Sequence, residues 1–306
     1  MSAFAMTQVV VIGAHSKYVG IPLLEALVED VFYSKIGQPV IALSRDASDI
    51  PVKSDRIKYV EWQDNSDLDK VFANADLVIN TTGPRADWDG ITEAVIRSKD
   101  RIRAYMPSEF GADPTDFAIQ PVPLGFQRKT ELAKRARDAG LKVIEVQTGA
   151  IDGDVGRIGA GFASIAGLDH QTNQVTFTGN PDNLFHATWN QDLGKSVASI
   201  AAFFGPDFSE VPDHVNIFSY AVTQRKVVER YSKTSGVALI YNDPVPYEKA
   251  LQIAVEQSIA GERTMPAFMQ ILHVLTASKP GKGMFFTTNH RELVNPGEKY
   301  FKWKAF

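Results

Sequence analysis

Residues 8–20 read QVVVIGAHSKYVG, and this stretch decides the fold class. Gln8–Ile12 is a valine-rich apolar run of strand length, and a helical pattern begins at Gly20. Pro22 falls in the first turn of that helix, where its missing N–H costs little. Dinucleotide-binding proteins use a strand, a glycine-containing turn and a helix to place backbone N–H groups against a pyrophosphate. The stretch therefore predicts a phosphate-binding turn at the start of an α/β domain.

The glycine pattern of this turn is incomplete. Gly13 and Gly20 are present, but the middle glycine is absent and the loop is one residue longer than the usual fingerprint. A plain strand–helix turn in a protein that has lost its cofactor is the alternative. We expect Ser16 and Lys17 to donate to phosphate directly, in place of the missing backbone contacts. The expected cofactor-binding residues of the turn are Gly13, His15, Ser16, Lys17, Tyr18, Val19 and Gly20.

Apolar runs of strand length alternate with helical patterns through the first half of the chain. This order predicts right-handed crossovers and a doubly wound parallel sheet of the Rossmann type, covered by helices on both faces. The expected strands are Gln8–Ile12, Pro39–Leu43, Ile57–Trp62, Asp76–Asn80, Ile102–Tyr105 and Lys142–Gln147. One helix is expected to begin at Gly20, and the other expected helices span Ser66–Ala73, Trp88–Ser98 and Phe126–Ala139.

Ligands of such sheets bind beyond the carboxyl ends of the strands. The second strand ends in Ser44 and Arg45. An arginine at this place suits the 2′-phosphate of NADPH, through bidentate charge-assisted hydrogen bonds, whereas an acidic residue would suit the ribose of NAD. A surface arginine is the alternative, and Lys53 is a second cation that would assist.

Small residues follow the fourth strand. Thr81, Thr82 and Gly83 would let the cofactor ribose and nicotinamide pass close to the backbone. A simple turn is an equally good interpretation of this segment.

The second half of the chain is less regular. We expect residues 1–150, continued by about 176–219, to form an NADP-binding Rossmann domain, and residues 151–175 and 220–306 to form a smaller substrate-binding lobe. The helix at Met265–Thr276 is apolar on almost every side, which indicates burial or a cover over a pocket. The tail from Tyr300 interleaves aromatic and lysine residues, and we expect it to pack on the smaller lobe rather than to bind a partner. The other expected elements are Gln174–Thr178, Asp192–Phe204, Val215–Phe218, Val222–Ser232 and Tyr247–Ile259.

Composition argues against several classes of function. The net charge of −4 does not favour a nucleic-acid partner, and no apolar run reaches the roughly 18 residues that span a bilayer. The chain has no cysteine, so disulfides, thiolate metal sites and cysteine nucleophiles are excluded. Its histidines are scattered, and we predict no metal site. The first residues lack the basic region of a signal peptide, so we expect a cytoplasmic protein. The partner that we expect is a small molecule.

The most specific motif follows the fifth strand. Residues 107–111 read Pro-Ser-Glu-Phe-Gly, and Phe126-Gln127-Arg128-Lys129 opens the next helix. Here the chain resembles the isoflavone reductase and phenylcoumaran benzylic ether reductase group, in the NmrA-like branch of the atypical short-chain dehydrogenases/reductases. The string at residues 107–111 is the hallmark of that group, and a Phe-x-x-Lys about this far downstream holds its catalytic lysine. Residues 178–180 and 192–194 also resemble segments of that family.

The resemblance implies that Lys129 is a general base or proton relay beside the nicotinamide. Partial desolvation disfavours the charged form of an amine, which fits proton exchange near neutrality. Gly125 stands where other short-chain dehydrogenases have their tyrosine, so a tyrosine mechanism is excluded at this position. A solvated helix lysine is the alternative. We expect cofactor contacts from Pro107, Ser108, Glu109, Phe110 and Lys129, and substrate contacts from Phe126 and Gly149.

These features together predict an NADPH-dependent reductase of a small, largely apolar or aromatic substrate. The cofactor would supply the hydride, and the protein would orient it and manage the proton. Two other functions stay open. One is a non-catalytic NADP(H)-binding regulator that acts through a protein partner. The other is a non-redox isomerase or lyase that reuses the same pocket, which the incomplete glycine turn would permit.

Overall fold

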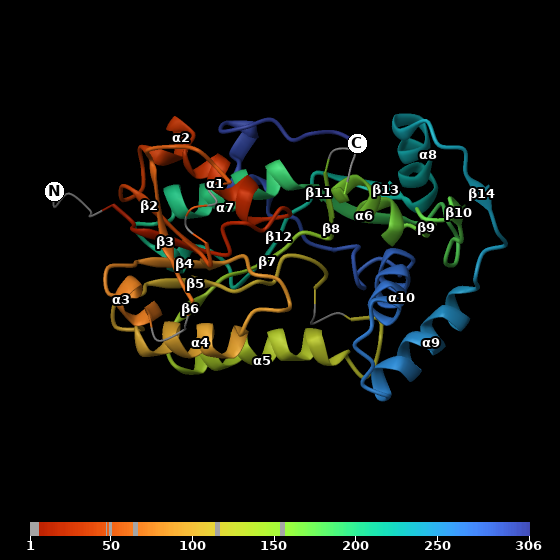
Figure 1. The fold of residues 1–306 in the computed structure, drawn as a ribbon, viewed down its shortest axis with the longest axis horizontal. Coiled ribbons are helices and arrows are strands. Elements are labelled where there is room, and N and C mark those ends of the chain that lie inside the picture. Colours follow the sequence, from red (N-terminus) through yellow and green to blue (C-terminus); the bar gives the residue numbers. More distant parts are fainter. Residues whose placement is uncertain (1–5, 47, 49–50, 64–66, 114–116, 154–156) are drawn as a thin grey trace.

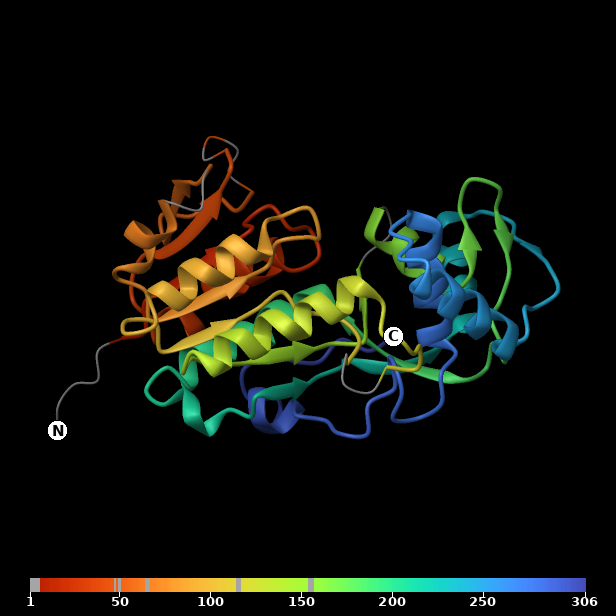
Figure 2. The same ribbon diagram turned by 90° about the horizontal axis from the view of Figure 1, so that it is seen from below.

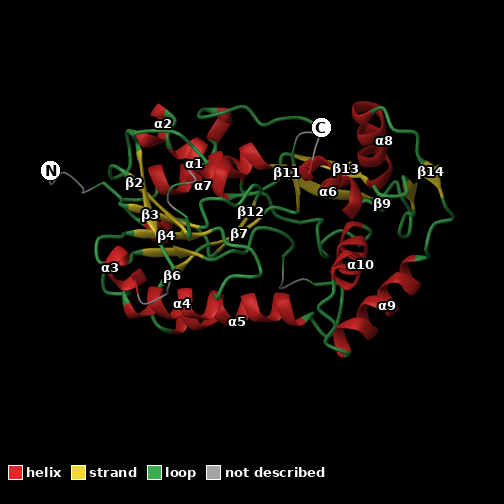
Figure 3. Ribbon diagram, viewed as in Figure 1, coloured by secondary structure: helices red, strands yellow, loops and turns green. Residues whose placement is uncertain are grey.

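The computed structural model describes residues 6–46, 48, 51–63, 67–113, 117–153 and 157–306. Its main feature is a sheet of six parallel strands in the order β3-β2-β1-β4-β5-β6 (Figures 1 and 3). The order reverses between β1 and β4, as in doubly wound Rossmann sheets, and the predicted fold class is confirmed. The strands are β1 Val9–Ile12, β2 Val40–Ser44, β3 Ile57–Glu61, β4 Leu77–Asn80, β5 Ala104–Met106 and β6 Lys142–Val143.

Helices cover both faces of this sheet (Figures 1 and 2). Side chains alternate along a strand, so Val9 and Val11 enter a hydrophobic cluster on one face, called the first cluster below, while Val10 and Ile12 enter the cluster on the opposite face of the sheet. On the first face lie α1 Gly20–Leu27, α2 Asp30–Tyr33 and α7 Asn190–Phe203, and on the second face lie α3 Leu68–Phe72, α4 Trp88–Arg97 and α5 Leu124–Asp138. Ser66, the expected first residue of α3, lies outside the described residues.

The expected strand Lys142–Gln147 is divided between two sheets. Val143 pairs with β5, and the chain then continues as β7 (Glu145–Gln147), which pairs in parallel with β12 (His214–Asn216). All three residues of β7 are buried although Glu145 and Gln147 are polar, and nothing in the local sequence marks the change from one sheet to the other.

The second half of the chain builds most of a separate hydrophobic cluster, called the second cluster below, at the other end of the molecule (Figure 1). Two three-stranded sheets lie there, in the orders β13-β11-β8 and β14-β10-β9. The strands are β8 Ala150–Asp152, β9 Leu168–Asp169, β10 Gln174–Val175, β11 Leu184–Trp189, β13 Tyr220–Thr223 and β14 Ile240–Tyr241. The helices are α6 Arg157–Ile165, α8 Gln224–Ser235, α9 Tyr247–Ile259 and α10 Met265–Thr276.

Three expectations for this half need correction. The helix expected from Val222 begins at Gln224, because Tyr220–Thr223 pairs with β11 and the Thr223 hydroxyl caps α8. Strand β11 lay within a segment expected to continue the Rossmann domain, yet its Phe185 and Ala187 join the second cluster. The α10 helix is not buried all round, because Met265 is 69% and Phe268 44% exposed.

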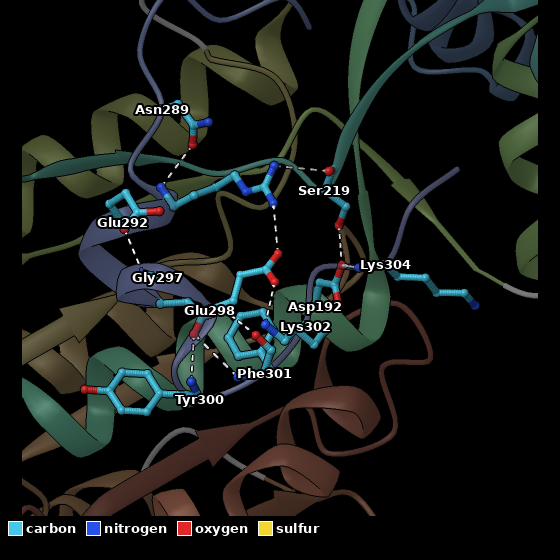
Figure 4. A network of polar contacts seen from close by, with 12 residues as sticks. Asp192, Ser219, Asn289, Glu292, Gly297, Glu298, Tyr300, Phe301, Lys302 and Lys304 are labelled. Carbon is cyan, nitrogen blue, oxygen red and sulfur yellow. Dashed lines mark hydrogen bonds and ion pairs between the residues drawn. The ribbon is translucent and has the colours of Figure 1, made fainter.

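The C-terminal segment packs on both parts of the molecule, because the ring of its last residue, Phe306, lies 5.1 Å from the Tyr220 ring and 4.4 Å from the Arg230 guanidinium in the smaller lobe. After the short helix α11 (Arg291–Val294), Phe301 is buried in the same cluster as α1 and α7. The Asp192 carboxylate, at the start of α7, accepts hydrogen bonds from the Ser219 hydroxyl at 2.6 Å and from the Lys304 amide at 2.9 Å (Figure 4). Among the described residues, no helix is long and apolar enough to cross a membrane.

Candidate functional site

The turn between β1 and α1 is built on a close approach of its two glycines. Gly13 has a φ of +89°, and a Cβ atom there would lie 2.9 Å from the Thr82 nitrogen. A Cβ atom at Gly20 would lie 2.3 Å from the Gly13 carbonyl oxygen. Both positions therefore require glycine. Of the first N–H groups of α1, that of Ile21 donates to the Ser16 carbonyl within the turn at 2.9 Å.

The other residues of the turn differ in what they present. Lys17 and Tyr18 are exposed, whereas the Val19 side chain is buried in the first cluster, so Val19 offers a ligand only its backbone. His15 Nδ1 lies 3.0 Å from the Ser44 hydroxyl, which ties the turn to the end of β2. Ser16 is half-buried, and its N–H donates to the Gly13 carbonyl at 2.9 Å.

Ser44 and Arg45 lie where β2 ends. The Ser44 side chain is buried and donates to the Asp46 carbonyl at 2.7 Å, so its hydroxyl is occupied inside the protein. Arg45 is exposed. The guanidinium is therefore the group that this strand end offers to an anion.

The segment after β4 supports the turn. The Thr81 hydroxyl lies 2.8 Å from the Ile12 carbonyl and 2.9 Å from the Gly13 carbonyl. The Thr82 hydroxyl donates to Asn80 Oδ1 at 2.7 Å and accepts from Trp88 Nε1 at 3.1 Å. Both hydroxyls thus fix the backbone. A Cβ atom at Gly83 would meet no atom within 4 Å, so the backbone there is open to a ligand.

A chain of hydrogen bonds joins the ends of β4 and β5 to helix α5. The Ser108 hydroxyl donates to the Thr82 carbonyl at 2.8 Å, and Lys129 Nζ donates to the Ser108 carbonyl at 2.5 Å. The Lys129 side chain is 21% exposed, and its Nζ lies 5.3 Å from the centre of the Trp88 ring. A cation at this distance from an indole face is attracted to it. Lys129 is therefore held at the carboxyl edge of the sheet and is not a freely solvated helix lysine.

The rest of the motif at residues 107–111 is mostly inside the protein. Pro107 is buried, and the half-buried Phe110 packs against the first hydrophobic cluster. Glu109 is 3% exposed, and its Oε2 lies 3.9 Å from Lys129 Nζ. Burial raises the pKa of Glu109 to about 7, although the nearby Lys129 charge lowers it. Its position suits a partner of Lys129 better than a direct ligand of a cofactor.

The two residues expected to bind substrate are placed differently from each other. Gly149 is enclosed, because a Cβ atom there would lie 2.3 Å from the His186 carbonyl oxygen and its N–H donates to the Gly111 carbonyl. This glycine is explained by packing. Phe126 is half-buried at the start of α5, with its ring 4.5 Å from that of Phe117, centre to centre.

Trp88 is the site residue that the sequence did not single out. Its indole contacts both Thr82 and Lys129, and it lies at the first position of α4, directly after the turn that follows β4. The sequence could have indicated this role, because Trp88 is an aromatic residue shortly after the end of β4. Among the described residues, no group of three or more His, Asp or Glu is placed to hold a metal ion.

These features fit a dinucleotide. The paired glycines bring backbone N–H groups to the start of α1, the exposed Arg45 offers a cation at the end of β2, and the open Gly83 leaves room beside the end of β4. The residues that would hold NADPH are thus spread along the carboxyl edge of β1, β2 and β4, with Lys129 at the far end.

Solved structures of reductases share this fold. Isoflavone reductase superposes with a TM-score of 0.64 at 19% identity, over 88% of this chain and 87% of that one. Leucoanthocyanidin reductase from Vitis vinifera, in complex with NADPH, gives 0.63 at 16% identity, over 91% and 86%. Triphenylmethane reductase from Citrobacter sp., complexed with NADP(H), gives 0.59 at 15% identity, over 94% and 95%. No described protein family and no curated protein matches the sequence. The chain has the fold of isoflavone reductase-like short-chain dehydrogenases/reductases.

Proposed function

We propose that this protein is an NADPH-dependent reductase of the isoflavone reductase-like, NmrA-like group, acting on a small, largely apolar or aromatic substrate. The observation that most supports this proposal is the hydrogen-bonded chain Lys129–Ser108–Thr82, which holds an amine at the carboxyl edge of a Rossmann sheet. Two structures of similar fold, solved with NADPH and with NADP(H), support the choice of cofactor.

NADPH would be held by three groups of residues. The turn from Gly13 to Gly20 would bind the pyrophosphate through backbone N–H groups, assisted by Ser16 and Lys17. Arg45 would pair with the 2′-phosphate. Thr81, Thr82 and Gly83 would leave room for the ribose and nicotinamide. In this proposal residues 1–150, with α7 and β12, form the cofactor-binding part. The smaller lobe, which is built on the second cluster, binds the substrate.

Lys129 would manage the proton. When NADPH is bound it supplies a hydride, and an electrophilic carbon of the substrate receives it. Negative charge then develops on a neighbouring atom of the substrate, and Nζ of Lys129 would donate to that atom. Trp88 and Ser108 would orient Nζ, because both contact it in the structure.

The test has two stages. NADPH is first titrated into the protein while nicotinamide fluorescence is followed, and we expect saturable binding that is tighter than that of NADH. Oxidation of NADPH is then measured with aromatic compounds of the kinds that structural neighbours are named for, such as a leucoanthocyanidin, pinoresinol and a triphenylmethane dye. Binding without turnover of any compound would favour the regulator, and failure to bind either cofactor would favour a non-redox enzyme.

A further inference from the structure

Glu109 is a buried carboxyl group with an incomplete set of partners. It is 3% exposed, and no described residue donates a hydrogen bond to its Oε1. Its other oxygen, Oε2, lies 3.9 Å from Lys129 Nζ, which is beyond hydrogen-bond distance. A permanently ionised carboxylate in such a place would normally accept several hydrogen bonds, because burying an unpaired charge is costly.

The charges around Glu109 come from three elements. Lys129 and Arg137 on α5 favour the ionised form of Glu109. Glu145 on β7 and Asp113 in the loop after β5 oppose it. The Arg137 guanidinium already forms ion pairs with Glu145 and, at 3.4 Å, with Asp213. Its charge is therefore largely balanced by other carboxylates. Burial is the largest influence on Glu109, and it raises the pKa of this carboxyl group to about 7.

We propose that Glu109 is the proton partner of Lys129, a positioning residue that stores the proton which Lys129 delivers to the substrate. This proposal rests on the proposed reductase function. As Nζ donates, an N–H bond of the ammonium breaks and an O–H bond forms on the substrate. The O–H bond of the Glu109 carboxylic acid then breaks as an N–H bond re-forms on Nζ, and Glu109 is left as a carboxylate. A proton from water restores the acid.

The geometry allows this exchange. Lys129 has four rotatable side-chain bonds, and a shift of about 1 Å brings Nζ within hydrogen-bond distance of Oε2. Contacts between catalytic groups are commonly long before substrate binds and shorten afterwards. Because Lys129 also donates to the Ser108 carbonyl, its ammonium is held between the proton store and the carboxyl edge of the sheet.

A structural ion pair is the competing explanation, and a pH–rate profile separates the two. If protonated Glu109 is the active form, turnover by the parent enzyme falls as the pH rises through about 7. Glu109→Gln should lose this limb of the profile and lower kcat by roughly ten- to a hundredfold, with the NADPH dissociation constant changed less than about threefold. Glu109→Asp should keep the limb and part of the activity. The matched control is Glu93→Gln, which alters a half-exposed carboxylate on α4.

An infrared titration tests the same proposal without turnover. The parent protein should show a carboxylic acid band that disappears as the pH rises through about 7. Lys129→Met should move this transition to higher pH, because it removes the nearest cation. Absence of a titrating band near that pH, or a Glu109→Gln enzyme with the pH–rate profile of the parent, would overturn the proposal. If no substrate is reduced, the reductase proposal fails, and the infrared titration still decides whether Glu109 holds a proton.

Discussion

A Cβ atom at residue 20 would lie 2.3 Å from the Gly13 carbonyl oxygen, so the start of α1 is fixed against the end of β1 by a contact that only glycine permits. The close approach aligns the first turn of the helix with the carboxyl edge of the sheet.

Gly20→Ala tests the importance of this contact. The added methyl group forces the helix away from the turn, so we expect unfolding to become easier by about 1–3 kcal/mol, the usual cost of overpacking. NADPH affinity should fall by at least tenfold, measured by fluorescence titration. Gly125→Ala is the control, since a Cβ atom there meets nothing within 4 Å. Equal NADPH affinity in Gly20→Ala and the parent would mean that the turn does not bind the cofactor.

The sequence predicted the six-stranded sheet well, because β1, β2, β4 and β5 are short runs of mostly apolar residues. It did not predict β11, whose run is interrupted by His186 and Thr188. The structure buries both. His186 stacks on the rings of Phe218 and Phe285, and the Thr188 hydroxyl donates to the Thr148 carbonyl at 2.7 Å. Partners so distant in sequence cannot be read from a local pattern.

The site shows the same division. Lys129 and the residues of the turn were predicted because they stand in recognisable motifs at strand ends. Trp88 and the inward direction of Glu109 were not, since both depend on how α4 and α5 pack against the loop after β5. Nothing in the sequence indicated that Gly149, expected to touch substrate, lets β8 begin against the His186 backbone.

Arg45→Ala tests cofactor choice. A charge-assisted pair with the 2′-phosphate contributes about 1.5–3 kcal/mol, so the parent should bind NADPH roughly ten- to a hundredfold more tightly than NADH. The variant should lose most of this preference, because NADH has no 2′-phosphate and its binding should hardly change. Both dissociation constants are measured by fluorescence titration. Lys70→Ala, a change of an exposed cation on α3, should leave the preference intact. Equal binding of the two cofactors by the parent would refute the role of Arg45.

His186 should make the protein sensitive to acid. Burial lowers the pKa of His186 to about 4, so the imidazole is neutral in the folded protein while the unfolded chain gains a proton below about 6.5. The stability that the neutral His186 contributes is therefore fully present above the pKa of histidine in the unfolded chain, about 6.5. It is lost as the pH falls from about 6.5 to about 4. Urea unfolding across this range should show a smaller loss in His186→Asn, although that variant is less stable at neutral pH. The exposed His170→Asn control should behave as the parent does.

Arg230→Met tests the buried ion pair of the smaller lobe. Arg230 donates to both oxygens of Asp152 at 2.6 Å, and the Asp152 side chain is 0% exposed. Removing the cation leaves a buried carboxylate that keeps hydrogen bonds only from the Tyr220 hydroxyl and the Gly153 N–H, which should cost about 3–5 kcal/mol of unfolding free energy. The double variant Asp152→Asn with Arg230→Met should recover much of that loss. A denaturation midpoint for the single variant close to that of the parent would show that the pair is dispensable.

Lys129→Met tests the proposed chemistry most directly. Lys129 Nζ donates to the Ser108 carbonyl, and methionine keeps most of the unbranched side chain while removing the amine. If Nζ transfers a proton in the transition state, turnover should fall by roughly a hundred- to ten-thousandfold. NADPH affinity should fall much less, because the turn after β1 and Arg45 after β2 are separate from α5, which carries Lys129. Lys134→Met is the matched control, since Lys134 is on the same helix with its side chain 72% exposed. Turnover of Lys129→Met within a few-fold of the parent, in a folded protein that still binds NADPH, would show that the lysine only ties α5 to the loop after β5.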